Sequence, residues 1–210
     1  MSAEIYLITP QQIPILKRFC DELSAVLDTG LVACLQLRLK NVKDDLLIRV
    51  AETILPVCHS RGVPLLLNDR PDLAVRVGCD GCHVGQNDIS YEDARMIMGP
   101  KAQIGVTCNN SRHLAMKAGE AGADYVAFGA FFPSDSKYDV PIASIDILTW
   151  WAELMTIPCV AIGGITEHNC KLLVRAGSDF LAVINAVWGH HGGPVVGIKA
   201  FDLSLKDNEY

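Results

Sequence analysis

The chain has 210 residues, of which half are hydrophobic and 20% are charged. This length suits one α/β domain, and so apolar a composition fits a sheet that is buried on both faces better than a half-solvated one. The formal net charge of −6 argues against a nucleic-acid binder, because phosphate backbones are held mainly by basic surface.

The sequence gives no sign of a signal peptide or a membrane span. Polar residues occur from Glu4 onward, and no uninterrupted apolar run is long enough to cross a bilayer. The eight cysteines have no framework spacing, so we interpret them as small buried hydrophobes. We therefore expect a cytoplasmic protein with no membrane partner.

One cysteine pattern needs separate attention. The segment Cys79-Asp-Gly-Cys-His83 spells C-x-x-C-H, the attachment motif of c-type haem. Haem attachment requires export, and the motif lies across a predicted buried strand, so we interpret it as a chance match. A zinc site is equally unsupported, because no second Cys or His pair has ligand spacing.

Short apolar runs flanked by Gly, Pro and polar residues predict buried strands along the whole chain. The predicted strands are Glu4–Thr9, Leu31–Leu37, Pro64–Leu67, Cys79–Val84, Gln103–Thr107, Asp124–Phe128, Pro158–Ile162 and Phe180–Ile184.

Helical spacing or a helix-start signal follows each predicted strand. The predicted helices are Pro10–Leu27, Asp44–Ser60, a short one from about Pro71, Ser90–Met98, Ser111–Ala121, one around Ser144–Met155, Glu167–Ala176 with Thr166 as its cap, and a weakly helical segment after Gly189. A polar loop, Phe131–Pro141, separates the sixth strand from its helix. We expect one catalytic domain over residues 1–205 and a loose tail over 206–210.

An internal repeat supports this count of elements. The triplets Gly78-Cys-Asp80, Gly122-Ala-Asp124 and Gly177-Ser-Asp179 each close a helix with Gly and precede strands four, six and eight. Strict strand–helix alternation at this length predicts a single (β/α)8 TIM barrel. A doubly wound open sheet is the alternative, but no G-x-G-x-x-G motif follows the first strand.

Two carboxylates are expected at the C-terminal rim of that barrel, where barrel enzymes carry their chemistry. Asn68 and Asp69 follow the third strand, and Asp88 follows the fourth. Parallel strands would bring them together, and hard oxygen ligands of this kind suit Mg²⁺ with a substrate phosphate completing its shell. Each Asp alone has a structural alternative, as the cap of the helix near Pro71 or as a loop end, whereas the pair favours the metal.

The other strand ends add cations, hydroxyls and glycines to the predicted rim. Arg38 and Lys40 end the second strand, Lys137 lies in the polar loop, and Gly163-Gly164 follows the seventh strand. Backbone N–H groups at such a glycine turn make an anion site, although each of these features could also be plain surface structure. Together they suit a substrate that carries a pyrophosphate bound with Mg²⁺.

These segments resemble the thiamine phosphate synthase (thiamine-phosphate pyrophosphorylase) family and its relative, the thiazole tautomerase. The matching motifs are Gln36-Leu-Arg-Leu-Lys40, Pro64-Leu-Leu-Leu-Asn-Asp-Arg70, Asp80-Gly-Cys-His-Val-Gly-Gln-Asn-Asp88, Ile104-Gly-Val-Thr107, Gly122-Ala-Asp-Tyr-Val126, Phe132-Pro-Ser-Asp-Ser-Lys137 and Ala161-Ile-Gly-Gly-Ile165. The resemblance implies a transferase that condenses 4-amino-2-methyl-5-hydroxymethylpyrimidine diphosphate with thiazole phosphate and releases pyrophosphate. Members of the family are often dimeric, which implies a homodimer.

The resemblance also implies roles for particular residues. Gln36 and Thr107 would contact the pyrimidine, and Asp69 and Asp88 would bind Mg²⁺. The residues of the diphosphate site would be Arg38, Lys40, Asn68, Ser134, Ser136 and Lys137, of which the three cations would be catalytic. Gly164, Ile184 and Asn185 would receive the thiazole phosphate. His83 we interpret as a core or supporting histidine rather than a catalytic base.

Some positions depart from the family pattern. Ser134-Asp-Ser-Lys137 stands where Thr-x-Thr-Lys is common, which keeps the hydroxyls but adds the charge of Asp135. Thr107 and Asn185 stand where Ser is usual. Three alternatives stay open: a tautomerase, which would need a histidine after the fifth strand; a non-catalytic barrel that binds thiamine precursors; and a Schiff-base lyase, which would need a lysine inside a strand.

Overall fold

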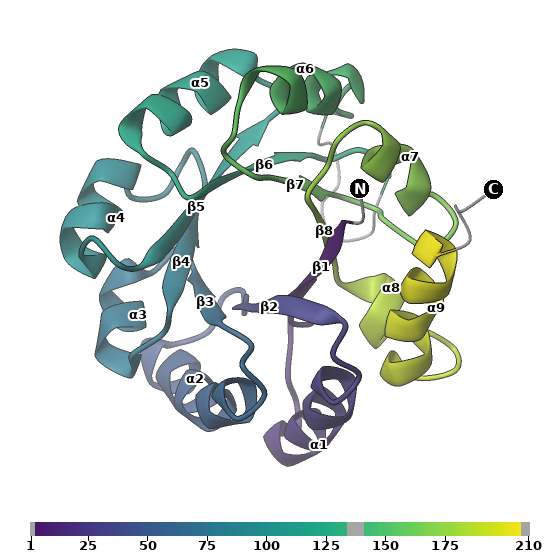
Figure 1. Cartoon of the computed structure of the whole chain (residues 1–210). Helices are drawn as coiled ribbons and strands as arrows, with labels where there is room; N and C mark the ends of the chain where they lie inside the picture. The colour runs from purple at the N-terminus through teal and green to yellow at the C-terminus, as the bar shows by residue number, and fades with distance from the viewer. Residues whose placement is uncertain (1–2, 134–140, 207–210) are drawn as a thin grey trace.

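Eight parallel strands pair in chain order, and the eighth closes on the first to form a barrel (Figure 1). The computed structural model describes residues 3–133 and 141–206. The strands are β1 (Glu4–Ile8), β2 (Val32–Leu37), β3 (Leu65–Asn68), β4 (Gly81–Val84), β5 (Gln103–Asn109), β6 (Tyr125–Gly129), β7 (Cys159–Ile162) and β8 (Phe180–Val183). The predicted TIM barrel is therefore confirmed.

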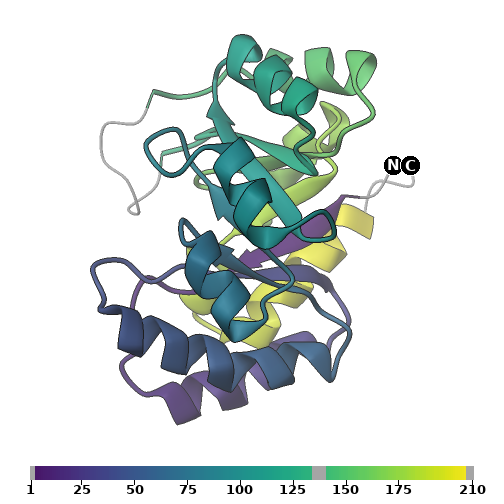
Figure 2. The same ribbon diagram turned by 90° about the vertical axis from the view of Figure 1, so that its left-hand side faces the viewer.

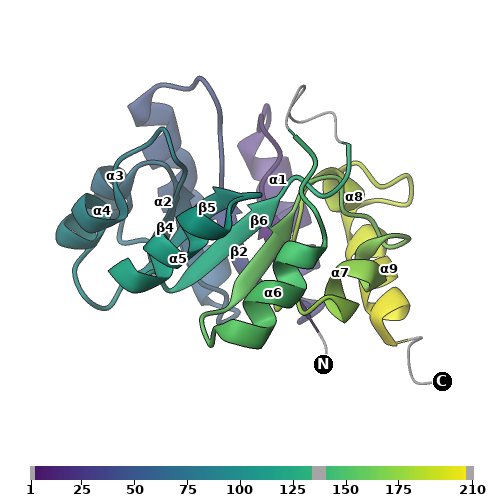
Figure 3. The same ribbon diagram turned by 90° about the horizontal axis from the view of Figure 1, so that it is seen from above.

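Helices surround the barrel as an outer layer. They are α1 (Leu16–Leu27), α2 (Asp44–His59), α3 (Pro71–Val77), α4 (Tyr91–Met98), α5 (Arg112–Ala121), α6 (Asp146–Leu154), α7 (Cys170–Arg175), α8 (Asn185–Trp188) and α9 (Pro194–Lys206). Neighbouring helices pack on one another, as α1 and α2 do in the side view of Figure 2 and α7 and α9 do in Figure 3. No helix in the described part of the chain has the length and apolar character needed to cross a membrane.

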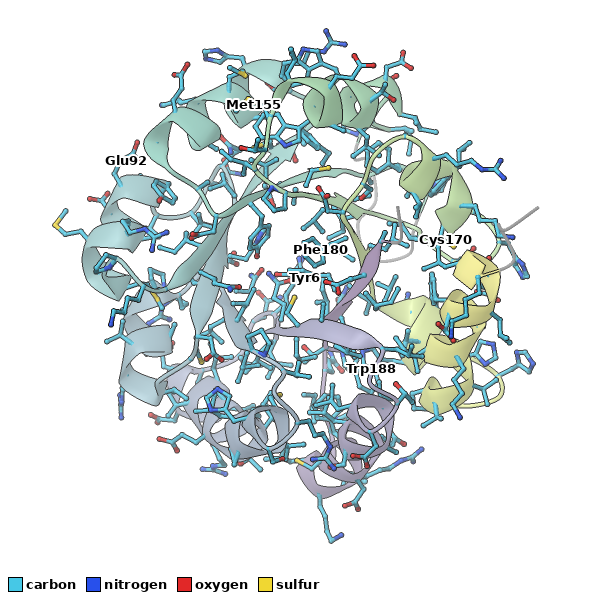
Figure 4. The ribbon with its side chains drawn as sticks, in the orientation of Figure 1. Tyr6, Glu92, Met155, Cys170, Phe180 and Trp188 are labelled. Atoms are coloured by element: carbon cyan, nitrogen blue, oxygen red, sulfur yellow. The ribbon has the colours of Figure 1, made fainter. Side chains whose placement is uncertain are left out.

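The barrel has two apolar regions, because successive strand residues face opposite sides. The larger core lies between strands and helices and contains the fully buried Leu35, Phe128 and Trp151. The smaller cluster fills the barrel interior, with Tyr6 and Tyr125 as its largest members. Figure 4 shows Tyr6 near the barrel axis and Trp188 in the helical layer.

The Gly-x-Asp repeat closes the N-terminal end of the barrel. Gly78 and Gly122 end α3 and α5 in the left-handed conformation, with φ of 85° and 95°. The carboxylates of Asp80, Asp124 and Asp179 then accept backbone N–H groups at the starts of β3, β5 and β7, over 2.7, 2.7 and 2.8 Å. Each repeat thus satisfies a strand-end donor that the sheet leaves unpaired.

Two predicted helices begin at least three residues too early. The first begins at Leu16 and not at Pro10, since Pro14 lacks an N–H and disfavours the helical conformation for the residue before it. The seventh begins at Cys170 and not at Glu167. There the Asn169 side chain accepts the Thr166 N–H and donates to the Gly164 carbonyl, which competes with a helical turn.

The C-terminal end of the chain is more helical than its sequence indicates. The segment predicted as weakly helical forms the 13-residue helix α9, which runs to Lys206. The rest of the expected tail lies outside the described residues, as does most of the polar loop Phe131–Pro141. The domain boundary at 205 therefore stays a prediction.

Candidate active site

A cavity of about 570 Å³ opens at the C-terminal ends of the strands. All eight strands or the loops that follow them contribute lining residues, from Ile8 at the end of β1 to Asn185 after β8. Ten residues that the sequence assigns to substrates or metal line it: Gln36, Arg38, Lys40, Asn68, Asp69, Asp88, Thr107, Gly164, Ile184 and Asn185. The remaining three, Ser134, Ser136 and Lys137, lie outside the described residues.

The two carboxylates of the cavity are held by backbone contacts at adjacent strand ends. Asp69 has a left-handed φ of 62°, and its N–H donates to the His83 carbonyl oxygen over 2.8 Å. Asp88 lies in the turn after β4, where its Oδ2 accepts the Gly85 N–H over 2.8 Å. The loop role considered for Asp88 is therefore present, and it fixes this carboxylate at the rim.

The helix-cap alternative for Asp69 is wrong. The cap position of α3 is Arg70, and no side chain makes a cap hydrogen bond there. The Arg70 guanidinium instead pairs with Asp44 and Asp72 on the outside of the barrel. Asp69 itself lines the cavity.

Arg38 is the cation most clearly coupled to both carboxylates. Its backbone N–H donates to Thr9 Oγ1 over 3.0 Å, which fixes the chain where β2 ends. Burial lowers the pKa of the Arg38 guanidinium, while the charges of Asp69 and Asp88 act in the opposite direction. The charges of both carboxylates therefore raise the pKa of one partly buried guanidinium.

Thr107 is held by two residues that the sequence did not assign to the substrates or the metal. The Gln86 Nε2 donates to the Thr107 carbonyl oxygen over 2.6 Å, and His83 Nε2 lies 2.7 Å from Thr107 Oγ1. Both residues line the cavity. Gln86 comes two residues after the end of β4, and this position was the sequence signal that could have placed it at the rim. The contact of His83 with Thr107 has no such signal, because it depends on how β4 pairs with β5.

The glycine turn after β7 packs tightly against the segment after β6. Gly163 and Gly164 have φ of 104° and 62°. A Cβ at Gly163 would lie 2.4 Å from the Ala130 Cβ, and one at Gly164 would lie 2.4 Å from the Pro133 carbonyl oxygen. Only glycine fits at both positions, and the turn brings backbone to the cavity wall.

Together, the fold and the cavity define an α/β-barrel enzyme of the kind that works at the C-terminal ends of its strands. Comparison with known proteins gives the particular family. Residues 5–187 match the family model described as thiamine monophosphate synthase, and the chain belongs to that family.

Curated relatives match over nearly the whole chain. The thiamine-phosphate synthase of Rhodospirillum centenum is 54% identical, over 96% of this chain and 97% of the relative. That of Hyphomonas neptunium is 45% identical, over 94% and 91%. Among solved structures, the thiamine phosphate pyrophosphorylase of Pyrococcus furiosus superposes with a TM-score of 0.85 at 27% identity, covering 97% of this chain and 96% of that one.

Proposed function

We propose that this protein is a thiamine-phosphate synthase. It would join 4-amino-2-methyl-5-hydroxymethylpyrimidine diphosphate to thiazole phosphate and release pyrophosphate. The observation that carries the proposal is that every described residue assigned to these substrates lines one cavity, in a chain whose full-length relatives bear this name.

The reaction needs charge stabilisation rather than a side-chain nucleophile. The bond between the benzylic-type carbon and the diphosphate oxygen breaks, and a bond from that carbon to the thiazole nitrogen forms. Negative charge builds on the leaving diphosphate, where Arg38, Lys40 and Lys137 would stabilise it and Asn68 would donate hydrogen bonds. The electron-rich pyrimidine, oriented by Gln36 and Thr107, would bear the positive charge while the two substrates are held together.

The residues at the rim fit a magnesium ion. Asp69 and Asp88 are hard oxygen donors at adjacent strand ends. The negative charge of each raises the pKa of Arg38. In the described ranges no group of three or more His, Cys, Asp or Glu side chains is placed to hold a metal. We propose that these two carboxylates share Mg²⁺ with oxygens of the diphosphate, because Mg²⁺ is commonly bound by one or two carboxylates together with substrate phosphates. When bound, the ion would neutralise the developing charge on the leaving group.

The thiazole phosphate would lie on the opposite side of the cavity. Gly164, Ile184 and Asn185 line the cavity at the ends of β7 and β8, and the glycine turn would offer backbone N–H donors to an anion. Because this arrangement puts the two phosphate-bearing groups at different strand ends, the reacting carbon and nitrogen would meet near the barrel axis.

Two of the alternatives lack the residues they would need. His113 lies within α5, and among described residues that line the cavity the one imidazole is that of His83, on β4. A tautomerase with a histidine after the fifth strand is therefore disfavoured. No lysine occurs within the strands of the described chain, which disfavours a Schiff-base lyase.

We also propose a cytoplasmic location and a homodimer. All eight cysteines are free, as is typical of a reducing compartment. The dimer rests on the resemblance, and the mass measured by light scattering would test it.

Turnover with both substrates and Mg²⁺ tests the proposed function. The wild-type protein should release pyrophosphate and form thiamine phosphate. Asp69→Ala or Lys137→Ala should lower turnover at least about a hundredfold, the usual scale for losing one electrostatic stabiliser.

The matched control is Asp28→Ala, which removes an exposed carboxylate that pairs with Arg61 and should leave turnover unchanged. Wild-type protein that binds both substrates without product would indicate the precursor-binding barrel. Near-normal turnover of Asp69→Ala would contradict the proposed role of that carboxylate.

A further inference from the structure

Four polar side chains form one hydrogen-bonded chain from the middle of the barrel to the cavity. Tyr6 Oη lies 2.8 Å from Tyr125 Oη, and Tyr125 Oη lies 3.0 Å from His83 Nδ1. His83 Nε2 in turn lies 2.7 Å from Thr107 Oγ1. Only the last member, Thr107, is one that the proposed reaction uses.

The strand register brings these side chains together. Tyr6 lies on β1, His83 on β4, Thr107 on β5 and Tyr125 on β6. Gly105 pairs with both His83 and Tyr125 across its two neighbouring strands. A Cβ at Gly105 would lie 1.9 Å from the Tyr125 Cζ, so the Tyr125 ring occupies the space that a side chain there would fill.

The phenol protons of Tyr6 and Tyr125 determine which atom donates in each of these hydrogen bonds. Tyr6 and Tyr125 are buried, and burial raises the pKa of both phenols, so each keeps its proton and needs an acceptor. Among the described residues the Tyr6 hydroxyl has Tyr125 as its one hydrogen-bond partner. Tyr6 therefore donates to Tyr125, and the Tyr125 proton is left to donate to His83 Nδ1.

A neutral imidazole that accepts at Nδ1 carries its proton at Nε2. The His83 Nε2–H then donates to Thr107 Oγ1. The Thr107 hydroxyl proton therefore does not take part in the hydrogen bonds between these four residues and can point into the cavity. The opposite direction would leave the Tyr6 proton without an acceptor among the described residues and would turn the Thr107 proton toward His83.

We propose that Tyr6, Tyr125 and His83 are positioning residues that fix Thr107 as a hydrogen-bond donor to the substrate. The acceptor would be a ring nitrogen of the aminopyrimidine diphosphate, a choice that rests on the proposed function. Gln86 supports the same arrangement, because its amide holds the Thr107 carbonyl oxygen. The three residues act through Thr107 and do not touch the reacting atoms.

The tautomer of His83 tests the chain without any assay of activity. Nitrogen-15 NMR of the unliganded protein, with imidazole labelled, reports which ring nitrogen carries the proton. We expect Nε2–H in the wild type and a shift of the population toward Nδ1–H in Tyr125→Phe, which removes the donor to Nδ1.

Tyr91→Phe is the matched control for this measurement. It also removes a partly buried phenol hydroxyl, one that donates to the Gly122 carbonyl oxygen in the helical layer, and it should leave the His83 tautomer unchanged. A proton found at Nδ1 in the wild type, or a tautomer that Tyr125→Phe does not alter, would overturn the proposal.

Kinetics with modified substrates test the consequence for Thr107. Thr107→Val should raise KM for the pyrimidine diphosphate about three- to tenfold, the usual scale of one hydrogen bond, and leave KM for thiazole phosphate unchanged. Thr107→Ser should restore the wild-type value. Tyr125→Phe should raise KM for the pyrimidine diphosphate, as Thr107→Val does, and should affect kcat less than KM.

Analogues in which each ring nitrogen is replaced in turn by C–H separate this role from a purely structural one. The wild type should discriminate against one analogue, and Thr107→Val and Tyr125→Phe should lose that discrimination. Equal discrimination in all three proteins would overturn the proposal. A wild type that shows Nε2–H but forms no thiamine phosphate would instead contradict the proposed function alone.

Discussion

At the scale of single residues, the main feature of the site is the partly buried charge of Arg38 and its position near two carboxylates. Arg38 gives up hydration, which lowers its pKa, and the carboxylates of Asp69 and Asp88 offset part of that cost. A diphosphate entering the cavity would meet Arg38 at a strand end whose backbone is already held by Thr9. A cation that the fold places there before the substrate arrives reduces the reorganisation needed during the reaction.

Replacing Arg38 tests this account of the charge. Arg38→Ala should lower kcat/KM at least about a hundredfold, because a fixed cation at the leaving group is lost. Steady-state kinetics with saturating Mg²⁺ would measure the change. Arg61→Ala is the control, since Arg61 pairs with Asp28 and lies outside the cavity lining. A comparable loss in both variants would argue against a specific role for Arg38.

At the scale of elements, the space inside the barrel depends on a glycine placed opposite a large ring. Tyr125 lies over Gly105, and its ring is centred 5.8 Å from that of Tyr6 and 5.6 Å from that of His83. The two ring contacts join β6 to β1 and to β4, neither of which is adjacent to β6 in the sequence. The barrel interior is therefore sensitive to any added side chain on β5.

Gly105→Ala should destabilise the fold. The added methyl group would overlap the Tyr125 ring and the β5 backbone cannot move without breaking its pairings, so we expect a loss of about 1–3 kcal/mol in the free energy of unfolding. Urea denaturation would measure it, and a second change, Tyr125→Ala, should relieve the overlap.

Gly119→Ala provides the comparison within a helix. The atoms nearest to its Cβ would be the flexible ends of Ile157 and Met155 at 3.2 Å and Trp151 Cη2 at 3.4 Å. Alanine also favours a helix over glycine. We expect a change within about 1 kcal/mol. If Gly105→Ala were equally mild, the packing described for the barrel interior would be wrong.

Element positions were largely predictable because each strand is a short apolar run bounded by turn residues, as at Cys159–Ile162. Helix starts were less so. Pro14 and the side chain of Asn169 change the first turn in ways that the apolar spacing does not show. Local competition for backbone hydrogen bonds decided both boundaries.

At the scale of the whole molecule, closing the barrel buries nearly every thiol. Burial raises the pKa of Cys58, Cys79, Cys82, Cys108 and Cys159 to about 12. Since the thiolate is the reactive form, these side chains are inert packing groups at neutral pH. The C-x-x-C-H segment thus behaves as part of the core, with Cys82 fully buried.

Thiol reactivity tests this packing. In native protein at neutral pH, Cys20 should react first with a disulfide reagent, because it alone is only partly buried, although burial raises the pKa of its thiol too. All eight cysteines should react once the chain is unfolded. Mass spectrometry of labelled peptides would assign the sites. Rapid native labelling of Cys79 or Cys82 would contradict the structure.

The rim was predictable from sequence because parallel strands must place their C-terminal ends at one edge, so polar residues such as Asp69 and Asp88 converge. The contacts of His83 and Gln86 with Thr107 were not predictable. They depend on the register of β4 against β5 and on the space that Gly105 leaves, and no local pattern encodes either.

Asp69 and Asp88 are proposed to share a divalent ion with the diphosphate. A crystal structure with Mn²⁺ and pyrophosphate, located by the anomalous signal of the metal, tests this proposal most directly. We expect one ion at about 2.1 Å from an oxygen of each carboxylate, with pyrophosphate between the ion and Arg38. An ion bound to neither carboxylate, or pyrophosphate bound away from this rim, would contradict the account.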